Sequence, residues 1–219
     1  MDIPKSFKDA VAGLRPFWVG LLIFWLICLL AIASVSKATS FFWLNQWHNR
    51  PLDVLFTGVT YLGDGLLVIL LVAVLLVLKK YYPAFAILAG YLVSGLGAQI
   101  FKALIKMPRP YNYFQAKGID IHNIEGITLQ HSINSFPSGH TATAFALVLS
   151  LLMVFPDLRR LQIVLFLAAI AIGYSRIFVG NHFLPDVLVG SMLGIAGSLL
   201  GIILVNYGYE KRKNKMAKS

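Results

Sequence analysis

Six long apolar runs constrain this chain more than any other feature of its sequence. Each approaches the ~20 residues that an α-helix needs to cross the hydrocarbon core of a bilayer. The runs are residues 16–36, 62–80, 83–105, 138–156, 160–180 and 185–207. They are continuous rather than alternating, and a backbone inside lipid must satisfy its polar groups within its own helix or in a closed barrel. The sequence therefore predicts an all-α polytopic membrane bundle with six transmembrane helices.

The composition agrees with a chain that lies mostly in lipid. Hydrophobic residues make up 58% of the 219 residues and charged residues only 13%, whereas charged residues are ~25% of an ordinary soluble domain. Six spans use up the length, so we expect a single membrane domain, 1–219, without a second folded unit. Within it we expect a cytoplasmic amphipathic segment at 1–15, a long outer loop at 106–137 and a basic cytoplasmic tail at 210–219. A frayed terminus is the alternative for the first segment.

The distribution of Lys and Arg predicts the orientation of the bundle. With six spans, both termini share one side with the second and fourth loops. Of the 19 Lys and Arg, seven fall on the other side: Lys37, Arg50, Lys102, Lys106, Arg109, Lys117 and Arg176. Cytoplasmic loops collect Lys and Arg, so both termini are expected in the cytoplasm. The net charge of +10 then indicates the orientation of the bundle in the membrane before it indicates a binding partner. No aromatic residues alternate with the tail cations for base stacking, and we expect no nucleic-acid partner.

Two loops on the predicted outer side carry an unusual set of polar residues. They supply Lys102 and Arg109 around the start of the long loop, Ser138, Gly139 and His140 at its end, and Arg176, His182 and Asp186 around the fifth loop. These residues are far apart in the sequence. The six-span topology nevertheless places all of them at one membrane face, which predicts a single site there.

The residue types in this set suit a phosphate group. Lys102, Arg109 and Arg176 supply three cations, and the planar guanidinium of arginine binds phosphate oxygens in a bidentate manner. Ser138 and Gly139 open a predicted helix, where backbone N–H groups and the helix dipole favour an anion. Glycine also allows an anion to approach the backbone closely. The sequence therefore predicts a phosphate-binding site.

Three strings in this set match a known signature: Lys102-x6-Arg109-Pro110, Pro137-Ser138-Gly139-His140 and Ser175-Arg176-x5-His182-x3-Asp186. On these residues the chain resembles the type 2 phosphatidic acid phosphatase superfamily, which shares its signature with vanadium haloperoxidases. The resemblance implies that His182 attacks phosphorus to form a phosphohistidine, that Asp186 fixes the tautomer of His182, and that His140 is the general acid and then the general base. It also implies that Lys102, Arg109, Ser138, Gly139 and Arg176 bind the phosphate.

The resemblance and the topology together imply an integral membrane lipid phosphatase at the outer face of a bacterial inner membrane. We expect it to hydrolyse a phosphomonoester or diphosphate of an envelope lipid, with lipid A or undecaprenyl diphosphate favoured and phosphatidylglycerol phosphate or phosphatidic acid still open. The alternatives are a lipid phosphotransferase, a non-catalytic phosphate-binding membrane protein and a vanadate-dependent haloperoxidase. The expected partners are the phosphorylated lipid and the bilayer, and the sequence leaves the oligomeric state open.

Several polar residues fall outside the signature. The sequence shows no paired-carboxylate site and no histidine–cysteine set, so we expect no metal and no cofactor. His48, His122 and His131 match no motif and are expected to be solvated. Asp64, between two glycines, is expected to be an exposed acid in a turn, with a role in the site as the alternative. Lys106 is expected to extend its ammonium group towards the membrane interface, with substrate contact as the alternative.

Overall fold

The structure is a computed structural model that describes residues 7–124 and 134–216. Among the residues named above, His131 lies outside these ranges. Within them all regular structure is helical, which confirms the predicted all-α class. The elements are α1 (Phe7–Ala12), α2 (Arg15–Ser34), α3 (Lys37–Leu44), α4 (Arg50–Tyr61), α5 (Gly65–Val77), α6 (Tyr81–Leu104), α7 (Pro110–Gln115), α8 (Gly139–Val154), a 3₁₀ turn (Pro156–Leu161), α9 (Gln162–Phe178) and α10 (Leu184–Met216).

The predicted count of six full-length spans is not confirmed. Among the described residues, four helical stretches are long and apolar enough to cross a membrane: α2, α6, the 3₁₀ turn with α9, and Leu184–Lys215 of α10. Within the predicted second span, 62–80, the structure has α5, which is long enough to cross a membrane only together with the preceding α4, across a bend of 50°. Asp64 caps the start of α5 by accepting a hydrogen bond from the Leu66 N–H, which explains why this helix begins anew at Gly65.

The helix α8 is shorter than the span predicted at 138–156. It has 16 residues, which corresponds to ~24 Å of helix, less than the ~30 Å hydrocarbon core. Pro156 accounts for its end, because a residue before proline is pushed out of the helical conformation. Phe155 is indeed extended, with φ −121° and ψ 91°.

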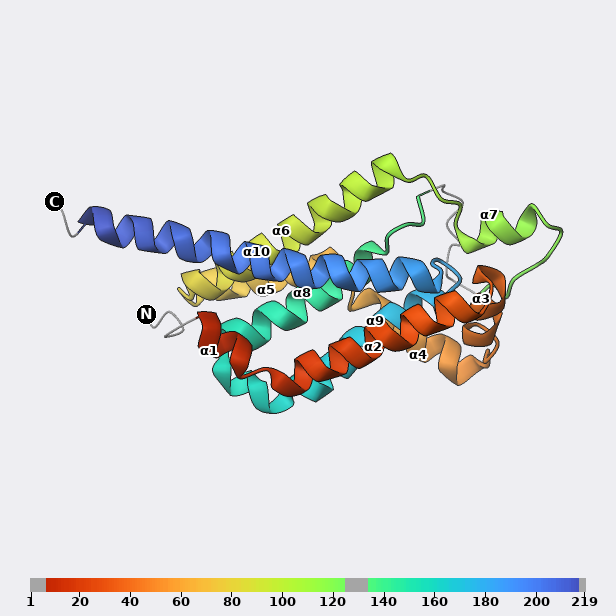
Figure 1. Cartoon of the computed structure of the whole chain (residues 1–219), viewed down its shortest axis with the longest axis horizontal. Coiled ribbons are helices and arrows are strands. Elements are labelled where there is room, and N and C mark those ends of the chain that lie inside the picture. The colour runs from red at the N-terminus through yellow and green to blue at the C-terminus, as the bar shows by residue number, and fades with distance from the viewer. Residues whose placement is uncertain (1–6, 125–133, 217–219) are drawn as a thin grey trace.

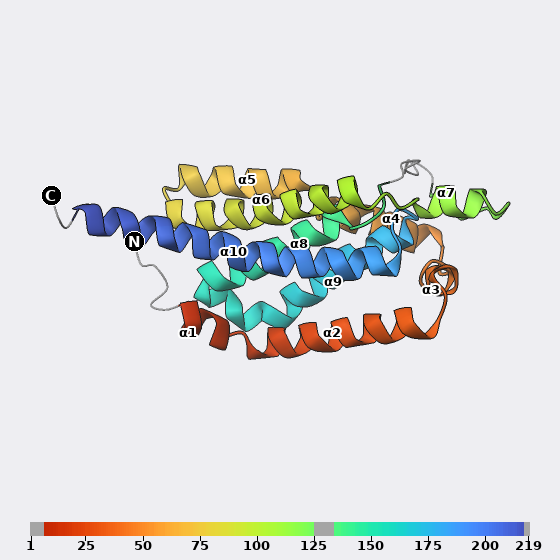
Figure 2. The ribbon, with the colours of Figure 1, turned by 45° about the horizontal axis from the view of Figure 1, so that its top comes forward.

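The helices run along the long axis of the molecule, so the bundle has two distinct ends (Figures 1 and 2). The described ends of the chain lie at one end, together with the connections from α5 to α6 and from α8 to α9. The opposite end holds α3, α7, the end of α6 and the start of α10. Every residue of the predicted phosphate site belongs to this second end.

The segments predicted to flank the bundle are more ordered than a loop or a tail. In the first segment, Ala10 and Leu14 are buried in the protein core, so its apolar face contacts the bundle. The long outer loop contains the short helix α7. The basic tail continues α10 as helix through residue 216.

Close packing of α10 on α8 and α6 holds the centre of the bundle. The helix α8 is buried on nearly all sides, as expected for a helix without a polar face. Glycines allow α10 to approach its neighbours: a Cβ on Gly194 would lie 2.5 Å from the carbonyl oxygen of Ala142 on α8, and a Cβ on Gly201 would collide with the backbone of Gly90 on α6. Small residues at such contacts are typical of helix packing in membranes.

Replacing Gly194 by alanine should therefore destabilise the protein. The added methyl group meets backbone rather than a flexible side chain, and overpacking of this kind typically costs ~1–3 kcal/mol. Gly208→Ala is the matched control on the same helix, because its Cβ would meet nothing within 4 Å. Thermal unfolding in detergent should show a lower Tm for Gly194→Ala only. An unchanged Tm for this variant would contradict the close approach of α10 and α8.

Candidate active site

The eight predicted site residues lie where five helices end or begin at the same end of the bundle. Lys102 lies in the last turn of α6 and Arg176 in the last turn of α9, while Arg109 caps α7. Ser138 caps α8, Gly139 and His140 begin it, His182 lies in the turn before α10, and Asp186 lies in the first turn of α10. Hydrogen bonds and electrostatic contacts connect these positions.

A buried histidine–aspartate pair occupies the turn between α9 and α10. His182 is 2% exposed, and its Nδ1 lies 3.3 Å from Oδ2 of Asp186. The carbonyl oxygen of Arg176 accepts the N–H groups of Asn181 and His182, both at 3.0 Å, and Gly180 takes the positive φ of 71° that this tight turn requires. Because a carboxylate can only accept, the contact places the ring proton on Nδ1 and leaves a lone pair on Nε2.

The Asp186 carboxylate is the centre of a wider hydrogen-bond network. Its Oδ2 also accepts the Phe183 N–H at 2.9 Å and the Ser135 hydroxyl. Its backbone carbonyl accepts the Ser138 N–H at 2.9 Å, which joins the start of α8 to the start of α10. A buried carboxylate without such partners would be very costly. Sequence reasoning missed Ser135, because a serine in an irregular loop has no spacing that marks its partner.

Two buried arginines flank the histidine. Nη1 of Arg109 donates to the carbonyl oxygen of Asn181 at 3.0 Å and lies 3.4 Å from Nε2 of His182. Nη1 of Arg176 donates to Oγ1 of Thr60 on α4 at 2.5 Å. The Nε of Arg176 is buried and has no hydrogen-bond partner among the described residues. An unpaired buried N–H costs ~1–3 kcal/mol, so this atom fits a site that receives an anion.

The start of α8 adds a third source of positive potential. Oγ of Ser138 accepts from the backbone N–H and the hydroxyl of Thr141, at 3.4 and 2.8 Å, as an N-cap residue does. The ammonium nitrogen of Lys102 lies 3.8 Å from the position that a Cβ on Gly139 would occupy. A lysine cation and the N–H groups of the first helical turn thus face the same small space, as an oxyanion requires.

His140 and Asp64 both lie near the place where the start of α8 meets the bend between α4 and α5. His140 packs on Gly63, where an added Cβ would lie 3.1 Å from the Cβ of His140. Asp64 is exposed, as predicted for a turn residue, yet it is close enough to interact electrostatically with His140 and Arg176. The bend therefore contributes to the electrostatics of the site.

Burial determines the protonation of His182. Its loss of solvation lowers the pKa to about 4, although the hydrogen bond and charge of Asp186 act in the opposite direction and Arg109 and Arg176 lower it further. The imidazole is therefore neutral at pH 7. A neutral ring whose unprotonated nitrogen faces Arg109, with Arg176 close enough to interact electrostatically, has the form of a nucleophile beside an anion-binding site.

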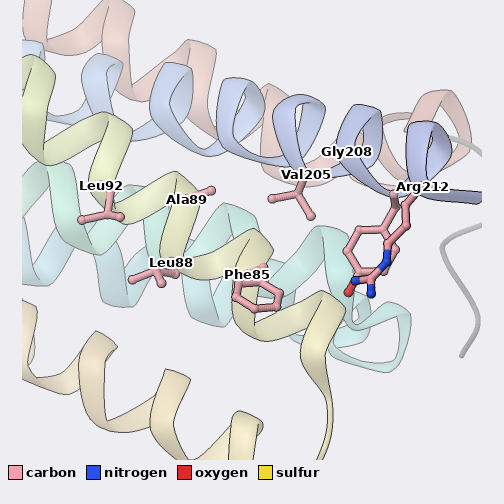
Figure 3. A pocket seen from close by; sticks show the side chains of 8 residues that line it. Phe85, Leu88, Ala89, Leu92, Val205, Gly208 and Arg212 are labelled. Atoms are coloured by element: carbon pink, nitrogen blue, oxygen red, sulfur yellow. The ribbon is translucent and has the colours of Figure 1, made fainter. Parts of the chain in front are cut away.

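Two apolar cavities lie outside this set of residues. One, of about 380 Å³, lies between α6 and α10 towards the chain termini, with Phe85 and Leu88 in its wall and Arg212 at one side (Figure 3). Another, of about 300 Å³, lies between α2, α3, α9 and α10 and has Leu184 and Val187 in its wall, on either side of Asp186 in the sequence.

Of the described histidines outside the signature, which were expected to be exposed to solvent, one is largely buried. His122 is half exposed, with 45% of its side chain accessible, whereas His48 is only 9% exposed. The expectation that His48 is solvated was therefore wrong. Both rings contact the carboxylate of Asp53, which brings together three residues that sequence spacing alone did not connect.

Comparison with known proteins gives one consistent family. A family model described as the PAP2 superfamily matches residues 83–210. Undecaprenyl-diphosphatase BcrC of Bacillus subtilis is 27% identical over 160 residues, which cover 73% of this chain and 74% of that protein. The crystal structure of Aquifex aeolicus LpxE has a TM-score of 0.62 and 30% sequence identity, over 74% of this chain and 92% of that chain.

A lipid A 1-phosphatase of Rhizobium johnstonii is also similar, with 32% identity over 111 residues. The match covers 51% of this chain and 43% of that protein, so the chain spans less than half the length of this relative.

The geometry predicts that the site binds an inorganic oxyanion. Orthovanadate or phosphate should raise the Tm of the wild-type protein, because a ligand that binds only the folded state stabilises it. Arg176→Lys should weaken this binding at least ~10-fold, since a lysine lacks the planar fork of donors. The control is Arg160→Lys in the 3₁₀ turn at the opposite end. An equal effect of the oxyanion on both variants would contradict the site.

Proposed function

Because the chain belongs to the PAP2 superfamily, we propose that it is an integral membrane lipid phosphatase whose active site is this constellation. The observation that carries the proposal is the placement of His182. Its Nδ1 faces Asp186 and its Nε2 faces Arg109, with Arg176 close by. Binding of phosphate alone would not require a buried, neutral histidine that contacts an aspartate through its other ring nitrogen.

In the first step, the phosphate of the lipid binds between Arg109, Arg176, Lys102 and the first turn of α8. Nε2 of His182 attacks phosphorus, and the bond from phosphorus to the lipid oxygen breaks. The electron pair of that bond stays on the leaving oxygen, which takes a proton from His140. Asp186 stabilises the positive charge that develops on the imidazole, and the arginines stabilise the charge on the transferring group.

In the second step, water attacks the phosphohistidine. His140, which lost its proton in the first step, now accepts a proton from this water. The bond between Nε2 and phosphorus breaks, its electron pair returns to Nε2, and phosphate leaves. A histidine suits both roles because its ring nitrogens can donate a proton in one step and accept one in the next. None of these steps calls for a metal or a cofactor.

We place the active site on the extracytoplasmic side of a bacterial inner membrane, with six crossings and both termini in the cytoplasm. The bent pair of α4 and α5 would form the second crossing and α8 the fourth. The separation of the chain termini from the site, at opposite ends of the bundle, supports this topology (Figure 1). So does the excess of Lys and Arg in the segments at the end where the termini lie.

The substrate we propose is a phosphorylated envelope lipid. The similarity to proteins named lipid A 1-phosphatase and undecaprenyl-diphosphatase supports these two substrate classes first. The pocket of cations recognises the phosphate, so the lipid tail must be distinguished elsewhere. Release of phosphate from a panel of lipid A, undecaprenyl diphosphate, phosphatidylglycerol phosphate and phosphatidic acid in detergent would decide between them.

The covalent intermediate gives the sharpest test. With a ³²P-labelled substrate, quenched wild-type protein should carry acid-labile label, and His182→Ala should carry none and lose at least ~10³-fold in kcat. His140→Ala should lose ~10²–10⁴-fold in hydrolysis yet still accumulate label from a diphosphate, whose leaving group needs little protonation. Asp120→Asn, an exposed residue of the outer loop, is the control. Retention of label by His182→Ala would refute the nucleophile, and full activity of either variant would refute the mechanism.

The pH dependence should reflect the buried histidine. His182 must be neutral to attack, and its pKa is lowered to about 4, so the rate should fall only as the pH drops through about 4 and not through 6.5. The measurement is kcat/KM from pH 3 to 9 with a monoester and a diphosphate, because a phosphate monoester itself ionises near ~6. A limb of the pH profile that moves when the substrate is changed reports the ionisation of the substrate. A substrate-independent fall of the rate on the acid side near pH 6.5 would contradict the burial of His182, whereas a fall on the alkaline side would report the loss of the proton from His140.

A further inference from the structure

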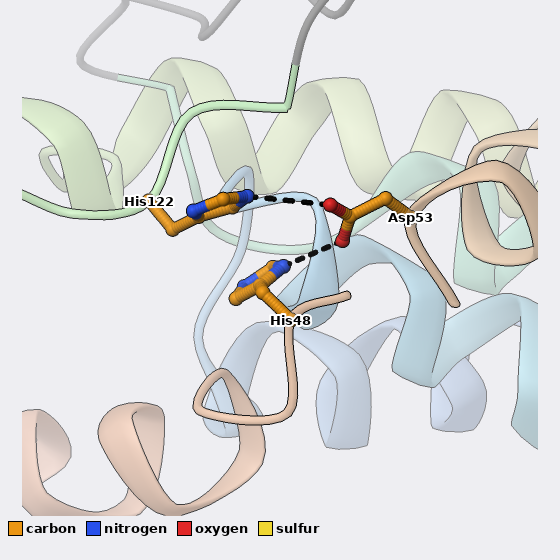
Figure 4. Close-up of side chains that lie close together, drawn as sticks. All are labelled: His48, Asp53 and His122. Carbon is orange, nitrogen blue, oxygen red and sulfur yellow. Dashed lines mark hydrogen bonds and ion pairs between the residues drawn. The ribbon is translucent and has the colours of Figure 1, made fainter. Parts of the chain in front are cut away.

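A second polar cluster, separate from the histidine–aspartate pair, lies at the same end of the bundle (Figure 4). It consists of His48 in the link between α3 and α4, Asp53 in the first turn of α4, and His122 in the segment after α7. Nδ1 of His48 lies 2.8 Å from Oδ1 of Asp53, and Nε2 of His122 lies 3.4 Å from Oδ2. The two imidazole rings are stacked, with centroids 4.0 Å apart.

The three side chains bring possible metal-binding atoms close together. One nitrogen of each histidine and one carboxylate oxygen all lie within 4.8 Å of one another. Two atoms that bind the same Zn²⁺ at ~2.0–2.1 Å in a tetrahedral arrangement lie ~3.3 Å apart. The two nitrogen–oxygen distances of 2.8 and 3.4 Å, one to each oxygen of the Asp53 carboxylate, lie on either side of this value. Small movements of the side chains would therefore complete a three-ligand site.

The chemistry of the donors selects the kind of cation. Two imidazole nitrogens and one carboxylate suit Zn²⁺ and neighbouring first-row transition ions, whereas Mg²⁺ and Ca²⁺ prefer oxygen ligands throughout. His48 is 9% exposed and Asp53 18%, while His122 is 45% exposed. The cluster is thus accessible from the solvent on the side of His122, where water could complete the coordination.

Packing around Phe178 preorganises the cluster. The centroid of the His48 ring lies 4.4 Å from that of Phe178, and the centroid of the Phe56 ring lies 4.5 Å from that of Phe178. Ile124, two residues after His122, is buried against Phe178 and Val179. The Nε2 of His48 is buried and has no hydrogen-bond partner among the described residues, so Nδ1 is the nitrogen that can reach a ligand.

We propose that His48, Asp53 and His122 form a binding site for a transition-metal cation, with Zn²⁺ as its simplest occupant. The ion would join three segments: the link between α3 and α4, the first turn of α4, and the outer loop. All three lie around Phe178, which follows Arg176 by two residues and precedes His182 by four. The ion would hold the outer loop against the end of α9. The proposal is independent of the phosphatase chemistry, since no metal ligand takes part in it.

Metal binding can be measured directly on the purified protein. The full chain, carrying an affinity tag without histidine, is treated with a chelator, desalted in detergent and titrated with ZnCl₂ by calorimetry. The expected result is one strong site per chain. His122→Asn and Asp53→Asn should each weaken binding at least ~10-fold, since the loss of even an outer-shell partner of a metal ligand costs 10–100-fold. Asp120→Asn, which removes an exposed carboxylate two residues from His122, is the matched control and should bind as the wild type does.

The catalytic histidines are the obvious competing zinc ligands, so His182→Ala is a second control. Strong binding that persists in His182→Ala and is lost in His122→Asn supports the proposal. The opposite pattern, binding lost in His182→Ala alone or lost equally in Asp120→Asn, overturns it, as does the absence of strong binding to the wild type.

Folding of each variant is checked by thermal unfolding in the presence of chelator. If Asp53→Asn does not fold, the half-exposed His122 still provides the test. Substitution by Co²⁺ gives an independent spectroscopic readout: visible absorption bands of a nitrogen- and oxygen-coordinated ion should appear in the wild type and be absent from His122→Asn. Identical spectra for the two proteins would overturn the proposal.

Discussion

The constraint on which the rest of the site depends is the burial of the Asp186 carboxylate. An anionic group removed from water is tolerated only when hydrogen bonds and nearby positive charge replace its solvation. Here the replacement comes from His182, Phe183 and Ser135, while the backbone of Asp186 binds Ser138. These partners belong to different elements of the bundle. Through its carboxylate and its backbone carbonyl, Asp186 therefore fixes the relative positions of the start of α8, the start of α10 and the turn after α9.

Helix packing transmits this local arrangement through the bundle. The glycines of α10 hold it against α8 and then α6, so the start of α8 cannot shift relative to α10 without a steric conflict. The end of α6, which carries Lys102, is positioned by the same contacts. The positions of Lys102 and of the start of α8 thus depend on this packed scaffold. Arg109 and Ser135, in contrast, come from the outer loop and contact His182 and Asp186.

Much of the site could be predicted from the sequence, because its residues are held by elements with clear patterns. Apolar runs indicate where the helices lie, and the topology predicts that their ends meet. The spacing of the fifth-loop residues also agrees with the structure, with Arg176 at the end of a helix, His182 in the turn and Asp186 at the start of the next helix. The length of α8 was missed, and so was α4, which precedes the predicted second span and joins it at a bend, since hydropathy alone does not show where a helix stops or starts. Pro156 and the cap at Asp64 decide both. Contacts such as Ser135 with Asp186 or Arg176 with Thr60 join residues over long sequence distances, and a single sequence carries no signal for them.

The shortness of α8 has a consequence for how a lipid meets the protein. If α8 forms the fourth crossing, as proposed above, a helix of ~24 Å does not extend across ~30 Å of hydrocarbon, and at least one of its ends lies below the level of the headgroups. If that end is the one at Gly139, the phosphate is received at the depth of the upper acyl chains, and the lipid need not leave its leaflet. Hydrophobic mismatch then becomes part of substrate selection. A membrane of different thickness would present the same headgroup at a different height relative to the same cations.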